Sequence, residues 1–370
     1  MIPHDGVVHH PFGGGSYYFK QNLIRYLNDR CTRPRIAVHI GSQPNSSPHL
    51  GNMTTFATGF ALAAALKTKF GREIRAKFVY VDSAPTPGAE IMIAGVRYQK
   101  SLKHTGDFGV HQTPFLKVLD QLSNLSGIPY DIETQSFWRS NPAFPAILRD
   151  IVAQHQKLGP HMSPEVGKLA IRASCPQEGC GLADKHGVNN QYHQDGRVTF
   201  VCPDHGDHHV DLTSPQDLER LEFNTPLRNL IRILICSQDS DTSWIMCTGS
   251  DYAGFYQEQL TWRLLERPGN APIIFYAPLV LDWSGVKLSK SLYVKQGAYK
   301  YLCDAGRSYM LDADTFLKNE GGLEALFQEV QDWVEKPYKL FRSYTIEYFD
   351  RQLISRGMKL PQTNGLCLDH

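Results

Sequence analysis

The first part of the chain alternates between apolar runs and a helical pattern. Residues 35–41 (RIAVHIG) form an apolar, β-branched run, a segment rich in Ser, Pro and Asn follows, and residues 50–67 have the pattern of a helix. Residues 74–82 (IRAKFVYVD) form a second apolar run soon after Gly71. This order predicts a βαβ unit, whose parallel strands need a right-handed helical crossover. The first hundred residues therefore predict the beginning of a nucleotide-binding type of α/β fold.

The pattern changes after about residue 101 and returns near residue 225. Helical patterns occur at residues 115–126 and 145–158, and a segment rich in cysteine and histidine follows. Buried-strand patterns reappear at residues 243–248 (SWIMCT) and 272–281 (PIIFYAPLVL), separated by a helical pattern at 252–266. We therefore predict an insertion between two halves of one sheet.

These changes divide the chain into four predicted segments. The first half of a Rossmann-like (HUP) core occupies residues 1–100, the insertion 101–224, the second half of the core 225–298, and a helical C-terminal tail 299–370. The tail is mainly amphipathic, with apolar residues at helical spacing from position 323 to position 334. The predicted fold class is α/β, with a parallel sheet.

Composition narrows the class of protein. Hydrophobic residues make up 42% and charged residues 20% of the chain, which is typical of globular proteins. The longest apolar stretch, residues 56–66, is far shorter than the roughly 20 residues of a membrane span. Because the first thirty residues contain no signal-like apolar run, we expect a cytoplasmic protein without a membrane partner. A net charge of +1 neither supports nor excludes an RNA partner.

One motif lies where the first predicted strand leads into the first predicted helix. It comprises residues 47–52 (SPHLGN). Backbone N–H groups at a helix N-terminus attract anions, so His49 there can contact phosphate. Gly51 would let a nucleotide approach the backbone closely. The same residues also suit an ordinary helix start.

Two further motifs follow later strands. Residues 287–291 (KLSKS) place Lys287 and Lys290 on a loop, where cations can stabilise negative charge as it develops. Residues 249–251 (GSD) place Asp251 at the carboxyl end of a strand, where ligands bind in open α/β sheets. Alone, the first motif is also typical of solvated surface, and the second of a helix N-cap.

In this order the motifs resemble those of class I aminoacyl-tRNA synthetases. Residues 49–52 are similar to the HIGH signature, with Asn52 in place of its last histidine, and residues 287–291 are similar to the KMSKS signature. Residues 249–251 are similar to a Gly-x-Asp segment that meets the ribose or the amino acid. The resemblance implies catalytic roles for His49, Asn52, Lys287 and Lys290. It implies contacts with the nucleotide or the tRNA end for Gly41, Gly51, Gly249, Asp251, Ser289 and Ser291.

The cysteine spacing in the insertion is typical of a metal site. Cys175 and Cys180 are separated by four residues, and Cys202 and His205 by two. Two such pairs can surround zinc tetrahedrally, so we predict a structural zinc ribbon at about residues 172–212. Nearby histidines leave the fourth ligand open: His186, His193, His208 and His209. Class I lysyl-tRNA synthetases carry a similar insertion, and this resemblance covers about residues 35–300. The other cysteines, Cys31, Cys236, Cys247, Cys303 and Cys367, are expected to be buried or free thiols.

Only 79 residues follow the KLSKS loop, which we expect to be too few for an anticodon-binding region. Cyclodipeptide synthases join aminoacyl groups from charged tRNAs on a synthetase-like core without such a region. Ser42 would be the nucleophile, since its loop is loosely similar to the Gly-x-Ser-x-x-Asn loop of the bacterial enzymes, with the serine displaced by one position. Ser42 also suits an ordinary turn at the end of a strand. The architecture looks more like that of the fungal arginine-containing cyclodipeptide synthases. This resemblance implies the acceptor end of aminoacyl-tRNA as partner, with no DNA partner, and arginyl-tRNA as substrate.

Two alternatives stay open. A truncated synthetase paralogue would activate an amino acid with ATP and Mg²⁺, which the preserved His49 and Lys290 favour. A non-catalytic tRNA-binding protein is the third hypothesis. The substrate is not legible from the sequence, although a cationic amino acid would suit three carboxylates near predicted strand ends, Asp82, Asp251 and Glu258.

Overall fold

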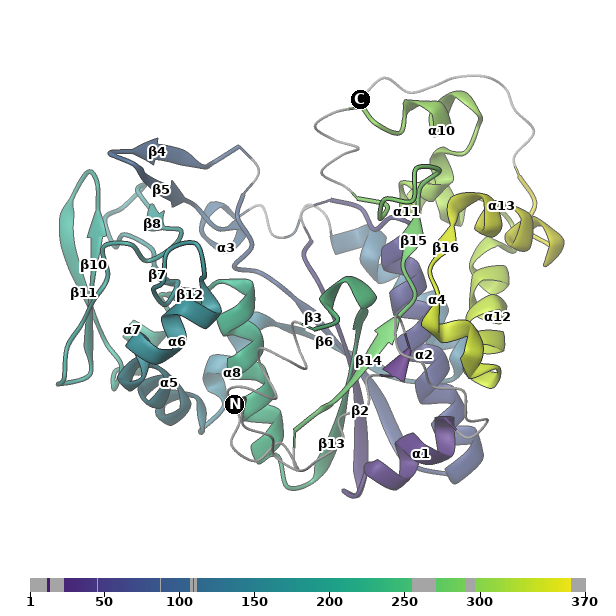
Figure 1. The fold of residues 1–370 in the computed structure, drawn as a ribbon, viewed down its shortest axis with the longest axis horizontal. Helices are drawn as coiled ribbons and strands as arrows, with labels where there is room; N and C mark the ends of the chain where they lie inside the picture. Colours follow the sequence, from purple (N-terminus) through teal and green to yellow (C-terminus); the bar gives the residue numbers. More distant parts are fainter. Residues whose placement is uncertain are drawn as a thin grey trace, which may run out of the picture.

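A parallel β-sheet forms the centre of the molecule. The computed structural model describes residues 12–13, 23–44, 46–86, 88–106, 109, 112–254, 271–289 and 297–360. The sheet has the strand order β1-β14-β13-β2-β3-β6, and each neighbouring pair is parallel (Figure 1). Its strands are β1 (Phe12–Gly13), β2 (Arg35–Ser42), β3 (Glu73–Tyr80), β6 (Tyr130–Thr134), β13 (Thr242–Gly249) and β14 (Ile273–Ala277). The predicted Rossmann-like α/β class is confirmed.

Helix α2 (Leu50–Phe70) crosses one face of the sheet directly after β2. Ile36, Val38 and Ile40 of β2 alternate into the hydrophobic core under this helix. A Cβ atom on Gly59 would lie 2.5 Å from Cδ1 of Ile40, so the glycine lets helix and strand approach closely. The helix ends at Gly71, which adopts a left-handed conformation with φ 63°.

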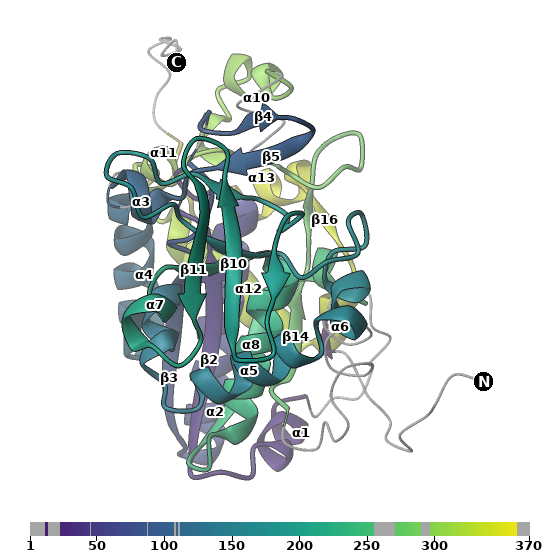
Figure 2. The ribbon, with the colours of Figure 1, turned by 90° about the vertical axis from the view of Figure 1, so that its left-hand side faces the viewer.

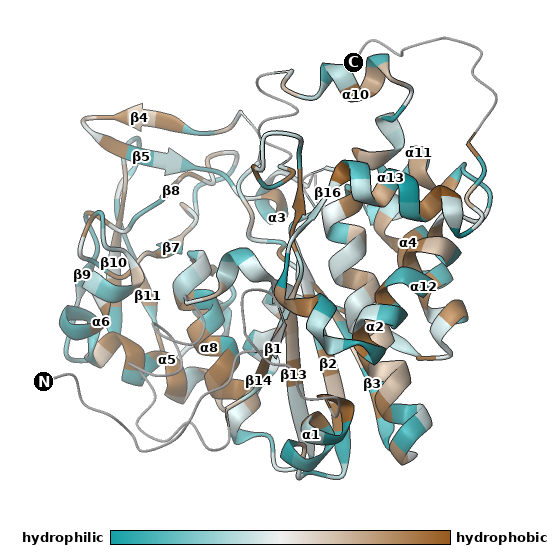
Figure 3. Ribbon diagram, turned by 45° about the vertical axis from the view of Figure 1, so that its right-hand side comes forward, coloured by the Kyte–Doolittle hydropathy of each residue, from teal (hydrophilic) through white to brown (hydrophobic). Residues whose placement is uncertain are grey.

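The C-terminal helices pack against α2 as an outer layer of the same core. Hydrophobic residues run along the central strands and alternate with hydrophilic ones around these helices (Figure 3). On this side lie α1 (Leu23–Arg30), α4 (Gln112–Ser126), α10 (Lys300–Asp304), α11 (Ala313–Leu317), α12 (Gly322–Glu335) and α13 (Ile346–Ser355), with the short helices η6 (Ser308–Met310) and η7 (Pro337–Phe341). The apolar residues predicted from position 323 to position 334 are buried in α12. The division of the chain into the four predicted segments stays a prediction.

The opposite face of the sheet is covered by α8 (Thr225–Gln238) and by the helices of the insertion. These are α5 (Phe144–Ala153), α6 (His155–Met162) and α7 (Pro215–Leu218), with η2 (Gln135–Ser140). Small antiparallel sheets lie beyond them (Figure 2). Their strands are β4 (Ile91–Ile93), β5 (Val96–Gln99), β7 (Ile171–Ala173), β8 (Ala183–Asp184), β9 (Gln191–Tyr192), β10 (Arg197–Cys202), β11 (Gly206–Asp211) and β12 (Leu221–Phe223); the short helix α3 (Leu102–Thr105) follows β5. None of the helices in the described part of the chain has the length and apolar character to cross a membrane.

The structure differs from the sequence-based expectations at three places. Strand β6 and helix α4, which lie within the segment predicted as an insertion, belong to the central core. The strand expected at 272–281 is two strands, because Pro278 lacks the N–H group that would continue the ladder. Its second part, β15 (Val280–Leu281), pairs with β16 (Tyr344–Thr345). The helix expected at 145–158 is divided at Gln154 into α5 and α6. The helix expected at 252–266 lies largely outside the described residues.

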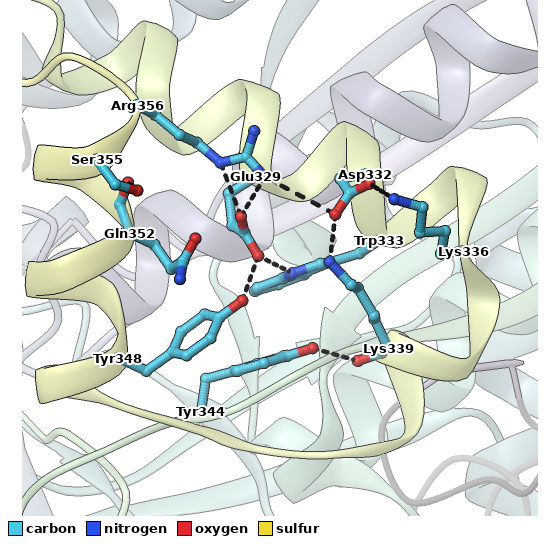
Figure 4. Close-up of polar contacts among 10 residues, drawn as sticks. All are labelled: Glu329, Asp332, Trp333, Lys336, Lys339, Tyr344, Tyr348, Gln352, Ser355 and Arg356. Atoms are coloured by element: carbon cyan, nitrogen blue, oxygen red, sulfur yellow. Dashed lines mark hydrogen bonds and ion pairs between the residues drawn. The ribbon is translucent and has the colours of Figure 1, made fainter.

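A buried carboxylate fixes α13 to α12 (Figure 4). Glu329 is fully buried and accepts hydrogen bonds from Nε1 of Trp333 at 2.7 Å and the hydroxyl of Tyr348 at 2.6 Å. Arg356 donates to the same carboxylate at 2.6 and 2.8 Å. A buried charge with this many partners is stabilised, whereas removing one member leaves the others unpaired.

We predict that Glu329→Gln lowers the free energy of unfolding by about 3 kcal/mol, because Arg356 loses the charge of its buried partner. Chemical denaturation measures the change. The matched control is Glu320→Gln, which breaks an ion pair with Lys359 whose side chains are 75% and 69% exposed. That loss should stay below about 1 kcal/mol. Equal losses in the two variants would contradict the structural role of Glu329.

Candidate functional site

A cavity of about 410 Å³ opens at the carboxyl ends of the central strands. It lies between the end of β2, the first turn of α2, the end of β13, the turn after β15, and helices α8 and η2. This size is within the range of small-molecule sites in proteins. Nine of the residues predicted from the sequence line it: Gly41, Ser42, His49, Gly51, Asn52, Gly249, Asp251, Lys287 and Ser289. The structure therefore gathers residues from all three motifs around one space.

Four other predicted residues are not placed in this lining. Asp82 is buried beside the site, where its Oδ1 accepts a hydrogen bond from the backbone N–H of Ser136 at 3.3 Å. It is absent from the cavity lining that the structure describes. Glu258, Lys290 and Ser291 lie outside the described residues.

His49 caps the first turn of α2. Its Nδ1 accepts a hydrogen bond from the N–H of Gly51 at 3.0 Å, and its own N–H donates to Oδ1 of Asn52 at 3.2 Å. The two bonds form a capping box, in which each side chain satisfies a backbone donor at the helix end. Asn52, which stands where the synthetase signature has histidine, closes this box. The ordinary helix-start interpretation of the motif is therefore correct, and the same residues also line the cavity.

Glycine at position 51 lets the ring of His49 lie close to the backbone. A Cβ atom on Gly51 would lie 2.9 Å from Cε1 of His49, which is too close for a real side chain unless the ring moves. A Cβ atom on Gly41 would lie 3.4 Å from Cε1 of His39, at the limit of ordinary van der Waals contact. The position of the His49 ring at the edge of the cavity therefore depends on Gly51.

Asp251 and Lys287 connect two of the motifs directly. Nζ of Lys287 lies 2.5 Å from Oδ2 of Asp251. Oδ1 of Asp282 holds the turn before Lys287, accepting from the N–H of Ser284 at 2.9 Å and of Val286 at 3.1 Å. Lys287 therefore reaches the cavity from a turn that hydrogen bonds hold in place, and its charge is paired with the carboxylate of Asp251.

Ser42 is the last residue of β2, and its carbonyl accepts a hydrogen bond from the N–H of Val81 at 3.0 Å. Its side chain makes no hydrogen bond to another described residue. The backbone at the end of the strand is thus fixed, and Ser42 is one of the residues that line the cavity.

The cavity has a polar floor, made by β2, η2 and α8, which was not predicted from the sequence. Nη1 of Arg232 lies 3.0 Å from Nε2 of His39, and its guanidinium lies over the ring of Trp138, 5.6 Å from the centroid. Burial, with the positive charge of Arg232, holds the pKa of His39 well below its usual range, so this imidazole is neutral at pH 7. Asn229 also lines the floor. The signal was present in α8, where Asn229 and Arg232 interrupt an apolar helical pattern.

The four predicted metal ligands lie together in the insertion. The donor atoms of Cys175, Cys180, Cys202 and His205 are all within 4.8 Å of one another. Sγ of Cys180 and Sγ of Cys202 are 3.7 Å apart. Nδ1 of His205 is 3.5 Å from Sγ of Cys175 and 3.5 Å from Sγ of Cys202. Tetrahedral zinc, with Zn–S about 2.3 Å and Zn–N about 2.0 Å, requires separations of roughly 3.7 Å and 3.5 Å. The donor set therefore has the size and chemistry that zinc prefers.

The alternative fourth ligands have other contacts. Nδ1 of His208 lies 2.9 Å from Nη2 of Arg220, and His193 and His209 both hydrogen-bond Oγ1 of Thr199. His186 is likewise outside the group of donor atoms. Among the remaining cysteines, Cys31, Cys236 and Cys247 are buried and Cys303 is half-buried, whereas Cys367 lies outside the described residues. Burial raises the pKa of Cys31 to about 11 and of Cys236 to about 12, so both are thiols at pH 7.

Comparison with known proteins finds likeness in structure but not in sequence. No protein-family model matches the chain, and no curated protein sequence matches it. A putative arginyl-tRNA synthetase from Campylobacter jejuni is 11% identical with a TM-score of 0.33, over 90% of this chain and 88% of that one. A glutamate-tRNA synthetase from Elizabethkingia anophelis is 12% identical with a TM-score of 0.31, over 71% and 54% of the two chains.

A glutamate-tRNA ligase from Elizabethkingia meningosepticum is 12% identical with a TM-score of 0.30, over 71% of this chain and 53% of that one. The chain thus spans about half the length of the two glutamate enzymes. All three neighbours are named as tRNA synthetases or ligases. Similarity at this level transfers neither substrate nor activity to this chain.

We predict about one zinc ion per purified chain, and a loss of most of that zinc in Cys175→Ser and His205→Ala, because each removes one of four ligands. Metal analysis by mass spectrometry measures the content. His208→Ala, which removes a histidine outside the cluster, is the matched control and should keep its zinc. Zinc lost in His208→Ala but kept in His205→Ala would show that the fourth ligand is assigned wrongly.

Proposed function

We propose that the chain is a tRNA-dependent cyclodipeptide synthase, which forms peptide bonds from aminoacyl groups delivered on charged tRNAs. The observation that carries this proposal is the position of Ser42, which lines the same cavity as residues of the two signature motifs. A nucleophile at this position could accept an aminoacyl group from the 3′ end of a tRNA. His49 and Gly51 would then hold the terminal adenosine and its phosphates.

The proposed transfer balances without ATP. The oxygen of Ser42 bonds to the aminoacyl carbonyl carbon, the ester bond to the ribose oxygen breaks, and the serine proton passes to that ribose oxygen. The amine of a second aminoacyl-tRNA then attacks the new ester and releases the serine. Attack of the free amine of the dipeptidyl group on its own ester carbonyl closes the ring and releases the second tRNA.

The pairing of Lys287 with Asp251 supports this proposal over an ATP-dependent ligase. A ligase needs lysine charge for the triphosphate, whereas the charge of Lys287 is matched by a carboxylate 2.5 Å away. Arginyl-tRNA as substrate rests on the resemblance to the fungal family. Asp251 is the one carboxylate among the described lining residues, and it is paired with Lys287.

The ligase remains the second candidate, because His49 and Lys287 line one cavity as synthetase signature residues do. In that case ATP and Mg²⁺ would be cofactors. We also propose a structural role for zinc at Cys175, Cys180, Cys202 and His205, since all four positions are filled by protein ligands.

Two assays on the full chain separate the candidates. The first supplies charged tRNAs without ATP, and the second measures exchange of pyrophosphate into ATP with each amino acid. We expect cyclodipeptide in the first assay and no exchange in the second. Exchange without any dipeptide would refute the synthase and support the ligase.

The nucleophile is tested by Ser42→Ala, which we expect to reduce dipeptide formation by a factor of about 10³ or more, because covalent capture is lost. Single-turnover transfer from radiolabelled aminoacyl-tRNA measures it. Ser237→Ala, at the far end of α8, is the control and should keep full activity, since its hydroxyl bonds the carbonyl of Ile233 outside the cavity. Full activity in Ser42→Ala would remove that residue from the mechanism.

A further inference from the structure

The floor of the cavity holds an amide group whose orientation is fixed by its neighbour. Asn229, on α8, is 3% exposed and lines the cavity. Nη2 of Arg232 donates a hydrogen bond to its side-chain oxygen, at 2.5 Å. Arginine has donors and no acceptor, so the atom that faces it must be the oxygen of the amide. The NH₂ group of Asn229 therefore points away from Arg232.

This NH₂ group is open to the cavity. It makes no hydrogen bond to another described residue, and it is not among the buried polar atoms that are sealed from solvent. A buried donor without a partner costs about 1–3 kcal/mol, so such groups normally face water or a ligand. The charged bond to Arg232 polarises the amide and makes its N–H groups stronger donors.

The amide is also connected to the backbone beside Ser42. Arg232 contacts His39 of β2, and its Nη1 would lie 3.7 Å from a Cβ atom on Gly41. Asn229, Arg232, Gly41 and Ser42 thus form a continuous line of neighbours along one side of the cavity. A group bound at Ser42 and a group bound at Asn229 could belong to one small molecule.

We propose that Asn229 donates a hydrogen bond to the carbonyl oxygen of the bound aminoacyl group. This inference rests on the proposed function, because it assumes that an aminoacyl group occupies the cavity. A phosphate oxygen of the nucleotide end is the other acceptor with suitable chemistry. A side-chain amide held in place before the ligand arrives is the type of donor that stabilises a carbonyl oxygen as negative charge develops on it.

Asn229→Asp tests the donor without changing its size. The aspartate keeps an oxygen for Arg232 and loses the N–H groups, so the bond that orders α8 is retained while the donor to the ligand is removed. Asn224→Asp on the same helix is the matched control. Asn224 caps α8 by accepting from the N–H of Leu227 at 3.0 Å, a role that aspartate also fills. Its NH₂ group donates to the carbonyl of Met162 at 2.9 Å, so the control also loses an amide donor, but at a residue that does not line the cavity.

The probes are a panel of 3′-aminoacylamino-3′-deoxyadenosines, which carry the carbonyl without a phosphate, and AMP, which carries a phosphate without that carbonyl. Affinity is measured by calorimetry, and thermal melting confirms that each variant is folded. We expect Asn229→Asp to bind the best aminoacyl probe about tenfold more weakly or worse, because one donor is replaced by a repelling oxygen. Its affinity for AMP and both affinities of Asn224→Asp should equal those of the wild type.

The outcomes separate this inference from the proposed function. Equal affinity of wild type and Asn229→Asp for the aminoacyl probe overturns the inference and leaves the function standing. Weakened binding of AMP instead of that probe also overturns it, because the acceptor is then a phosphate. If the wild type forms no dipeptide but the variant still loses affinity for the aminoacyl probe, the inference holds and the function fails. If the wild type binds no aminoacyl probe, both fail.

Discussion

The position of α2 against β2 is the constraint on which both the core and the cavity depend. Three features fix it: the capping box of His49 at its start, the contact of Gly59 with Ile40 in its middle, and the left-handed Gly71 at its end. The C-terminal helices pack on the outer side of α2, so a displacement of α2 would displace these helices too. The N-terminal turn of α2 brings Gly51 and Asn52 to the cavity. A motif that resembles a catalytic signature therefore also has a structural task.

The two faces of β2 divide these tasks. Ile36, Val38 and Ile40 point into the core under α2, and the alternation of a strand sends His39 and Gly41 to the opposite face. His39 pairs in register with Met246 of β13, which packs in the core under α8. A histidine buried on this face requires a polar partner, and Arg232 provides it from α8. The polar floor of the cavity thus follows from one buried polar residue, His39, in the apolar middle of the strand.

The sequence predicted the elements whose patterns are strong and local. Strands β2, β3 and β13 and helix α2 have apolar runs or long helical patterns, and the metal ligands have a spacing that few other sites share. Strand β6 was missed because none of its residues is fully buried, so it has no clear apolar signal. The break at Pro278 could be predicted from the sequence. The pairing of β15 with β16, at residues 344–345, could not, because it depends on how distant segments pack together. The roles of Arg232 and Asn229 could not be predicted, because their position in the cavity depends on the packing of α8 against β2.

The insertion shows why a metal ion would matter to a site that it does not touch. Several strands of the insertion have only two or three residues. The hydrophobic cluster near the metal ligands contains Tyr98, Leu182 and the three cysteine ligands. So small a cluster buries too little apolar surface to be stable alone, and metal binding commonly supplies the difference. Cys175 lies two residues after the end of β7, and β7 pairs with β12. Strand β12 ends at Phe223, and the next residue is the N-cap of α8. A metal ion held there would therefore stabilise the start of the helix that carries Asn229 and Arg232 into the cavity.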